Sequence, residues 1–134
     1  MTSPHEILNP STLADPVGFS HAVVVAEGRT VYLGGQAAHD ADGNIVGTSM
    51  AEQFTQAAAN VVTALDAAGG KPEHLVSMQI FVTDVVAYKD ALEELSSAYR
   101  EHFGRHYPAI ALLEVKGLFD SAAKVELVCI AVIP

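Results

Sequence analysis

Basic residues are scarce in this sequence, which has only seven Lys and Arg residues against sixteen Asp and Glu, for a formal net charge of -9. Nucleic-acid binding draws on clustered Lys and Arg side chains that neutralise phosphates. The few basic residues here are scattered along the chain. The composition therefore argues against a nucleic-acid partner.

Cysteine is almost absent, since Cys129 is the only one. An intrachain disulfide is excluded, and the reducing cytoplasm is the expected compartment. Residues 1–10 lack the basic start and the apolar run of a signal peptide, and the longest apolar stretches are only as long as a strand. We therefore expect neither a secretory leader nor a membrane partner.

Apolar residues, by contrast, are plentiful. The chain has 134 residues, of which 50% are hydrophobic and 17% charged. These values are typical of a single globular domain, spanning residues 1–134, with one core. A domain of this size cannot bury so much apolar surface alone, so we expect a subunit interface to cover part of it.

The apolar periodicity predicts an α+β fold with the order β-β-α-β-α-β-β. The expected elements are an irregular lead-in over residues 1–18, a hairpin of strands over 21–26 and 30–34, a helix over 49–68, a strand over 75–82, a helix over 84–103, and strands over 109–115 and 124–132. Ser49 and Glu52 have the spacing of a capping box, and Asp84 is the expected N-cap of the second helix. Two helices can cover only one face of the sheet, so we expect self-association to cover the other.

Glu126 is the most unusual residue, because it lies within the most apolar strand, residues 124–132. A strand that is apolar on both faces is normally buried, and carboxylates are rarely buried without a partner. A buried Glu126 would be a candidate general acid or base. The alternative is a structural residue near water, at an open sheet edge or a subunit seam. Glu114 is a second carboxylate in apolar surroundings, on the strand face of Ile110 and Leu112, and spacing alone does not tell whether it faces Glu126.

The remaining chemical signals are weaker. The run Gly34-Gly35-Gln36 follows a strand and can present backbone N–H groups to an anion or a carbonyl, although a tight strand exit is the commoner explanation. His21 opens a strand and is interpreted first as a partly exposed polar residue. His102 and His106 have a helical ligand spacing, but Gly104 lies between them and no acid completes a metal site. A P-loop, a dinucleotide fingerprint and a nucleophile elbow are all absent, so we expect neither a metal nor a cofactor.

Several short motifs occur in a fixed order over residues 16–132. They are Val17-Gly18-Phe19-Ser20-His21-Ala22, Leu33-Gly34-Gly35-Gln36, Gln53 with Gln56 and Asn60, Ala67-Ala68-Gly69, Phe81-Val82-Thr83-Asp84, Pro108-Ala109 and Val125-Glu126. In this order the motifs resemble those of the Rid family, also called YjgF/YER057c/UK114 or L-PSP. Singly they are loose, but together they are fairly specific.

The resemblance implies a chorismate-mutase-like fold assembled as a homotrimer, whose sheets form a central barrel. Ligand sites would then lie in the three clefts between subunits. The best-known activity of the family is hydrolysis of reactive enamines and imines, released by pyridoxal-phosphate enzymes, to 2-oxo acids and ammonia. In the family, an Arg two residues after the signature Pro grips the substrate carboxylate, and a Glu on the last strand positions water.

The sequence departs from the family pattern at the expected ligand-binding positions. Ile110 replaces the Arg, Phe19 a Tyr, Gly34 a Ser, Leu92 a polar residue and Leu112 a frequent Cys. Loss of a desolvated Arg clamp removes a contact of roughly 2–5 kcal/mol. Standard 2-iminoacid deamination is therefore not expected, and the cleft suits a neutral, apolar or aromatic small molecule that lacks a carboxylate.

Two functions follow as expectations. In the first, a cytoplasmic homotrimer hydrolyses or tautomerises a small imine, enamine or carbonyl compound, with Glu126 as acid/base or water-positioning group. The Gly35 N–H, with His21 as a second candidate, would hold the polarised atom. Phe19, Gly34, Leu92, Ile110, Leu112 and Glu114 are the other expected substrate-binding residues. In the second, the protein is catalytically inactive and binds an apolar metabolite or a partner protein in the same cleft.

Overall fold

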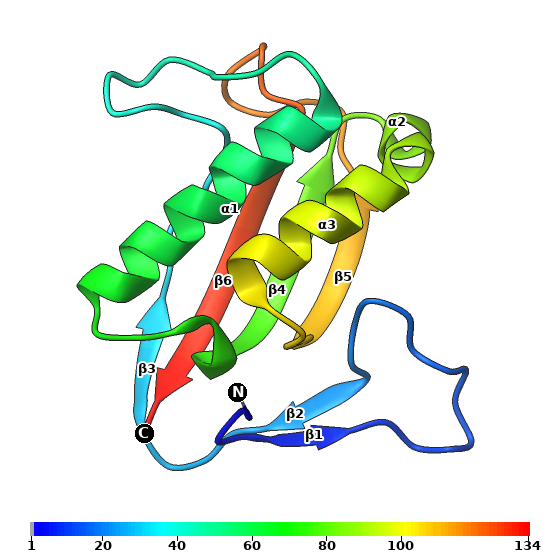
Figure 1. The fold of residues 1–134 in the computed structure, drawn as a ribbon, viewed down its shortest axis with the longest axis vertical. Helices are drawn as coiled ribbons and strands as arrows, with labels where there is room; N and C mark the ends of the chain where they lie inside the picture. Colours follow the sequence, from blue (N-terminus) through cyan, green and yellow to red (C-terminus); the bar gives the residue numbers. More distant parts are fainter. Residues whose placement is uncertain (1) are drawn as a thin grey trace.

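A computed structural model describes residues 2–134 of the chain and has an α+β fold. Its main sheet has the strand order β3-β6-β4-β5, and β1 and β2 form a separate two-stranded sheet. The elements are β1 (Glu6–Leu8), β2 (Ala22–Val24), β3 (Arg29–Tyr32), α1 (Met50–Ala67), a short 3-10 turn (Pro72–His74), β4 (Leu75–Val82), α2 (Val85–Asp90), α3 (Leu92–Phe103), β5 (Ala109–Glu114) and β6 (Val125–Ile133). Helices α1 and α3 lie across one face of the main sheet (Figure 1). The predicted fold class, with its helices on one face, is confirmed.

Strand β6 lies in the interior of the main sheet, between β3 and β4. Both of these pairings are antiparallel, whereas β4 and β5 are parallel. The parallel pair requires a long crossover, which α2 and α3 supply. The fold therefore places β5 at the edge of the sheet, next to α3.

Alternation along β6 separates the core from the other face of the sheet. Val125, Leu127 and Cys129 are buried under the helices. Glu126, Val128 and Ile130 point to the other face and are only half-buried. Burial raises the pKa of the Cys129 thiol to about 12. Cys129 is thus a small core residue and not a reactive thiol.

The face of the main sheet opposite the helices is called the open face here; it carries Tyr32, Phe81, Leu113, Glu126, Val128 and Ile130. Tyr32 is 78% exposed and Leu113 is 42% exposed. Within residues 2–134 no helix covers the middle of this face. Its expected burial by self-association stays a prediction. None of the helices in the described part of the chain is long and apolar enough to cross a membrane.

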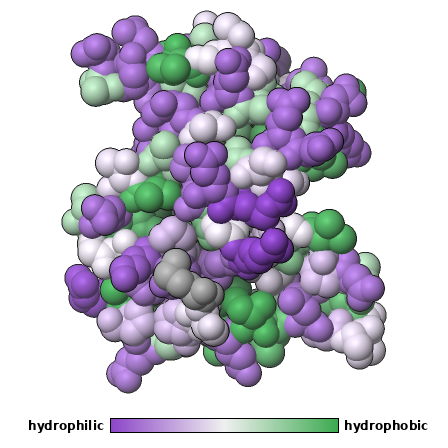
Figure 2. Space-filling view, viewed as in Figure 1, coloured by the Kyte–Doolittle hydropathy of each residue, from purple (hydrophilic) through white to green (hydrophobic). Residues whose placement is uncertain are grey.

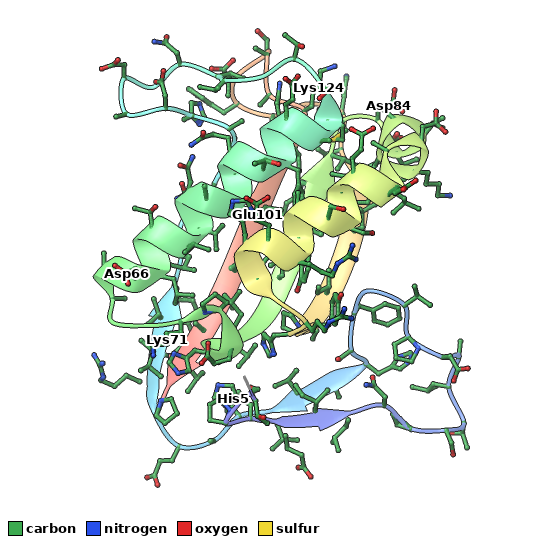
Figure 3. All side chains as sticks on the ribbon, in the orientation of Figure 1. His5, Asp66, Lys71, Asp84, Glu101 and Lys124 are labelled. Carbon is green, nitrogen blue, oxygen red and sulfur yellow. The ribbon has the colours of Figure 1, made fainter. Side chains whose placement is uncertain are left out.

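The predicted start of each helix is confirmed. Ser49 caps α1 by accepting from the Glu52 N–H, and the Glu52 carboxylate accepts from the Ser49 N–H, which completes the capping box. Asp84, marked in Figure 3, accepts from the Ala87 N–H at the start of α2. The single helix predicted over residues 84–103 is interrupted at Ala91, which separates α2 from α3.

The predicted N-terminal hairpin is wrong. Strand β2 pairs with β1, and β3 pairs with β6, so the two segments belong to different sheets. Part of the lead-in that was expected to be irregular is therefore strand β1. Gly28 lies in the connection between β2 and β3, where a Cβ atom would collide with the carbonyl group of Ile133. A glycine is therefore needed where the chain passes the end of β6. Because a glycine between two short apolar segments is also the pattern of a hairpin turn, the sequence of this connection resembles one.

Candidate functional site

Glu126 and Gly35 are in direct contact on the open face. The segment after β3 continues alongside β6, since Leu33 N–H donates to the Cys129 carbonyl at 3.1 Å and Gln36 exchanges two backbone hydrogen bonds with Leu127, at 2.9 and 2.8 Å. A Cβ atom on Gly35 would lie 2.5 Å from Oε2 of Glu126 and 3.0 Å from its Cδ. The carboxylate therefore lies against the backbone because residue 35 has no side chain. We call this pair the Gly35–Glu126 site.

Both groups of this site are free of protein partners within residues 2–134. The single ion pair found there joins His39 and Asp120, at 3.7 Å, so no Lys or Arg neutralises Glu126. Neither the Glu126 carboxylate nor the Gly35 N–H forms a hydrogen bond to another residue of this part of the chain. The site thus offers an acceptor and a backbone donor close together, a pairing that can hold a water molecule or a polarised carbonyl or imine.

Two side chains of α1 hold the backbone on both sides of this site. Asn60 Nδ2 donates to the carbonyls of Ala37, at 3.1 Å, and His39, at 2.8 Å, just after Gly35. Gln53 donates to the Ala122 carbonyl at 3.0 Å and accepts from the Lys124 N–H at 2.8 Å, just before Glu126. Gln53 is only 1% exposed. Both residues belong to the motifs that carried the family resemblance, and their role here is to fix the site's backbone.

A cavity of about 540 Å³ lies on the other side of the sheet, between the helices and β5. Its lining comes from α2 and α3 (Tyr88, Leu92, Leu95, Ser96, Tyr99, Arg100), from β4 and β5 (Ile80, Ile110, Leu112), and from two loops (Val17, Gly18, Phe19, Tyr107). The molecular outline is indented between α2 and the loop of residues 9–21 (Figure 2). We call this space the α3–β5 cavity. Its size is that of a small-molecule site.

Four of the predicted ligand-binding residues meet in the α3–β5 cavity, namely Phe19, Leu92, Ile110 and Leu112. Phe19 is held there by its neighbour Ser20, whose N–H donates to the Pro108 carbonyl at 3.0 Å and whose hydroxyl donates to the Tyr107 carbonyl at 2.6 Å. The sequence predicted the apolar character of this group.

The main sheet separates these four residues from Glu126. Ile110 and Leu112 are paired with Met78 and Ile80, whose side chains face the helices. Glu126 is paired with Phe81, on the open face. One chain therefore does not bring the predicted catalytic acid and the predicted apolar residues to the same ligand.

The other predicted residues have different surroundings. Glu114 shares the strand face of Ile110, and its Oε1 accepts from the Val85 N–H at 2.9 Å, so it caps α2 and does not face Glu126. His21 lies beside Phe19, with ring centroids 5.1 Å apart, and its Nε2 is 2.7 Å from the Ala14 carbonyl oxygen. Gly34 is exposed and has open space beside it.

Sequence reasoning missed the polar groups of the α3–β5 cavity. Tyr88 and Tyr99 both line the cavity, and burial raises the pKa of both phenols. Tyr99 stacks on Tyr107, with ring centroids 5.1 Å apart, and donates to the His106 carbonyl. Arg100 was not singled out, although Leu92, Ser96 and Arg100 recur every four residues along one side of α3, a spacing that is visible in the sequence.

The histidines do not converge. His102 Nδ1 lies 2.9 Å from the Ala98 carbonyl oxygen, and His106 Nε2 lies 2.8 Å from that of Leu75. In the described part of the chain no three His, Cys, Asp or Glu side chains are grouped as metal ligands would be.

Comparison with known proteins places this geometry in context. The family described as Endoribonuclease L-PSP matches residues 11–133. The bovine (Bos taurus) 2-iminobutanoate/2-iminopropanoate deaminase is 31% identical over 115 residues, covering 85% of this chain and 79% of the relative, and a mitochondrial protein of Schizosaccharomyces pombe, mmf2, is 31% identical over 127 residues, covering 92% and 94%. A crystal structure of a Rid family protein from Yersinia pestis superposes with a TM-score of 0.87 at 28% identity, covering 96% of this chain and 98% of the other.

Proposed function

This chain belongs to the Endoribonuclease L-PSP family, which includes the Rid proteins, and on that premise we propose that it hydrolyses or tautomerises a small imine, enamine or carbonyl compound. The observation that carries the proposal is the unpartnered Glu126 carboxylate lying against the Gly35 backbone. The names of deaminase relatives support the same class of chemistry. The ribonuclease activity in the family's description is not proposed, because a net charge of -9 opposes binding to a phosphate backbone.

The reacting site is proposed to lie between two copies of the chain. The Gly35–Glu126 site and the α3–β5 cavity are on opposite faces of one sheet, so only a neighbouring copy can supply the missing half. The partly exposed apolar residues of the open face support such an assembly, which in this family we expect to be a homotrimer. The buried single cysteine fits a reducing compartment, and we propose the cytoplasm.

In the proposed reaction, Glu126 accepts a proton from a water molecule as its oxygen attacks the imine carbon. Glu126 returns this proton to the imine nitrogen, which gives a carbinolamine. It then takes the proton of the new hydroxyl group and passes it to the nitrogen as the C–N bond breaks, so the products are a carbonyl compound and ammonia. The Gly35 N–H, with no hydrogen-bond partner in residues 2–134, donates to the atom on which negative charge develops. In the tautomerisation of an enol or enamine, Glu126 moves the proton between carbon and the heteroatom.

The part of the ligand that meets Ile110 and Leu112 is proposed to be apolar and not the carboxylate of a 2-imino acid. The strand wall of the α3–β5 cavity contains only Ile80, Ile110 and Leu112, and it has no cation. A carboxylate placed against this wall would lose its hydration without a charged partner, which is costly. An aliphatic or aromatic group meets no such penalty.

Turnover of neutral imines and enol-type compounds, compared in the wild type and in Glu126→Gln, tests the proposal. A general acid–base contribution predicts a loss of about 10²- to 10⁴-fold in kcat/KM. Glu114→Gln is the matched control, because that carboxylate caps α2 and does not face the proposed site. Equal rates in the wild type and in Glu126→Gln would remove Glu126 from the chemistry.

A second candidate is a binding protein without catalysis that uses the same apolar cavity. The observation in its favour is the apolar strand wall at position 110, where the family carries its substrate-binding Arg. Thermal stabilisation by the compounds of the panel, without any product, would favour this candidate.

A further inference from the structure

Arg100 is the single Lys or Arg residue in the lining of the α3–β5 cavity. It lies in the last turn of α3, in the same row as Leu92 and Ser96, so that side of the helix changes from apolar to hydroxyl to cationic along its length. Helix α3 and strand β5 run in opposite directions past the cavity (Figure 1). Arg100 is therefore at the end of the cavity where β5 begins, the end to which Ile110 belongs.

No carboxylate in residues 2–134 neutralises Arg100. The ion pair present in that part of the chain is His39–Asp120, elsewhere in the molecule. The helical neighbours three and four residues away from Arg100 are Ser96, Ser97, Phe103 and Gly104, none of them acidic. The adjacent Glu101 faces the groove between α1 and α3, which also contains Glu93 and Glu94 (Figure 3). An Arg residue with no acidic partner in the described residues is unusual in the lining of a largely apolar cavity, in a chain with a net charge of -9.

The Ser96 hydroxyl adds a second polar group to the same wall. It lines the cavity one helical turn before Arg100, and it makes no hydrogen bond within the described residues. Arg100 and Ser96, one helical turn apart in the same lining, carry the donors that a carboxylate accepts, whereas a neutral apolar ligand would leave both unused. The opposite wall, Phe19 with Ile110 and Leu112, remains apolar.

We propose that the α3–β5 cavity binds organic carboxylates, with the carboxylate on Arg100 and Ser96 and an aromatic or branched aliphatic body against Phe19, Ile110 and Leu112. This inference rests on the proposed function in taking the cavity as the ligand site. It keeps the apolar body of the expected ligand but replaces the expectation of a neutral compound without a carboxylate by a compound with one anionic end. In the family pattern the cation that binds the carboxylate is on the strand wall, at the position of Ile110. In this proposal it is Arg100, on the helix wall.

Calorimetric titration with phenylacetate and with its neutral isostere phenylacetamide tests the inference on the intact protein. The wild type is expected to bind the acid at least about tenfold more tightly than the amide, since only the acid forms charge-assisted bonds. Raising the salt concentration from about 0.05 M to about 0.5 M should weaken the binding of the acid and leave the affinity for the amide unchanged, because Arg100 is exposed and salt screens its charge.

Arg100→Gln should abolish the preference for the acid and leave the affinity for the amide as it was. Arg105→Gln is the matched control: it removes the same charge from an exposed position five residues further on, outside the cavity lining, and should keep the preference. Equal loss in both variants would mean a general effect of net charge and would overturn the inference.

The inference is also overturned if the wild type binds acid and amide equally, or binds neither. Its failure is distinguishable from that of the proposed function, which is tested by turnover in Glu126→Gln. If the protein turns over neutral compounds but binds acid and amide equally, the proposed reaction stands and the proposed role of Arg100 is rejected. Acid preference without turnover would keep Arg100 and reject the reaction.

Discussion

The Glu126 carboxylate lies against the backbone of Gly35, at a distance that leaves no room for a Cβ atom on residue 35. The relationship joins the last strand of the sheet to the segment that follows β3. Because Gly35 has a negative φ angle, its glycine is required by the carboxylate and not by the backbone conformation.

Gly35→Ala is expected to displace the Glu126 side chain and lower kcat/KM by at least about tenfold, with little change in stability, because the carboxylate is the flexible end of the side chain. Gly117→Ala is the matched control, since a Cβ there meets open space and the residue lies outside the proposed site. It should keep full activity and gain up to about 1 kcal/mol of stability from the stiffer unfolded chain. The measurements are steady-state kinetics and urea denaturation. Similar activity in the two alanine variants would contradict a role for the contact.

Gln53→Leu is expected to lower the free energy of unfolding by about 2–4 kcal/mol, because it removes three part-buried hydrogen bonds, to the carbonyls of Gly47 and Ala122 and from the N–H of Lys124. Gln56→Leu, which loses one bond to the Asn60 side chain, should cost about 1 kcal/mol or less. Urea denaturation of both variants gives the comparison. Equal losses of unfolding free energy in the two variants would show that the hydrogen bonds of Gln53 do not stabilise the backbone at the start of β6.

The pH dependence of stability is expected to reflect His106. Burial lowers its pKa below the ordinary value of 6.5. As the pH falls through 6.5, His106 therefore takes up a proton in the unfolded chain before it does so in the folded protein. The free energy of unfolding decreases over this range, until the pH is below the folded-state pKa of His106. Above pH 6.5 this group does not affect the free energy of unfolding. His106→Gln, whose amide can still donate to the Leu75 carbonyl, should reduce this fall. Denaturation at a series of pH values provides the test, and the same slope in both proteins would exclude His106 as the cause.

The open face provides a test of assembly. Tyr32→Asp places a charge among its apolar side chains and is expected to convert a trimer into monomers, as followed by sedimentation velocity. Thr63→Asp adds the same charge on the exposed side of α1 and should leave the trimer intact. A stable monomer of the wild-type protein would contradict both the trimer and the site between subunits.

Local signals in the sequence were sufficient for much of the fold. The capping box at Ser49, the helix over residues 49–68 and the strand over residues 75–82 were predicted because each depends on neighbours a few residues apart. The partner of β2 was not predicted, because β1 and β2 are joined by a long loop and the short connection to β3 contains a turn-like glycine. Strand pairing between distant segments depends on tertiary contacts that a local pattern does not record.

The candidate site was predicted in its parts but not in its arrangement. The apolar group at Phe19, Leu92, Ile110 and Leu112 was anticipated, and the structure brings these residues together. Their separation from Glu126 depends on which face of the sheet the helices cover, and a strand that is apolar on both faces does not reveal that. Arg100 was missed because a lone charged residue on a helix is ordinarily a solvated one.

The place of β6 between β3 and β4 also has a consequence for biosynthesis. Both neighbours of this strand leave the ribosome before it does, and until it follows, β3 has no partner in the main sheet and β4 is paired on one side only, with β5. Folding of the main sheet is therefore completed only after residues 125–133 have been synthesised. During that interval β3 and one edge of β4 expose unpaired backbone groups, and such edges can pair with those of other chains.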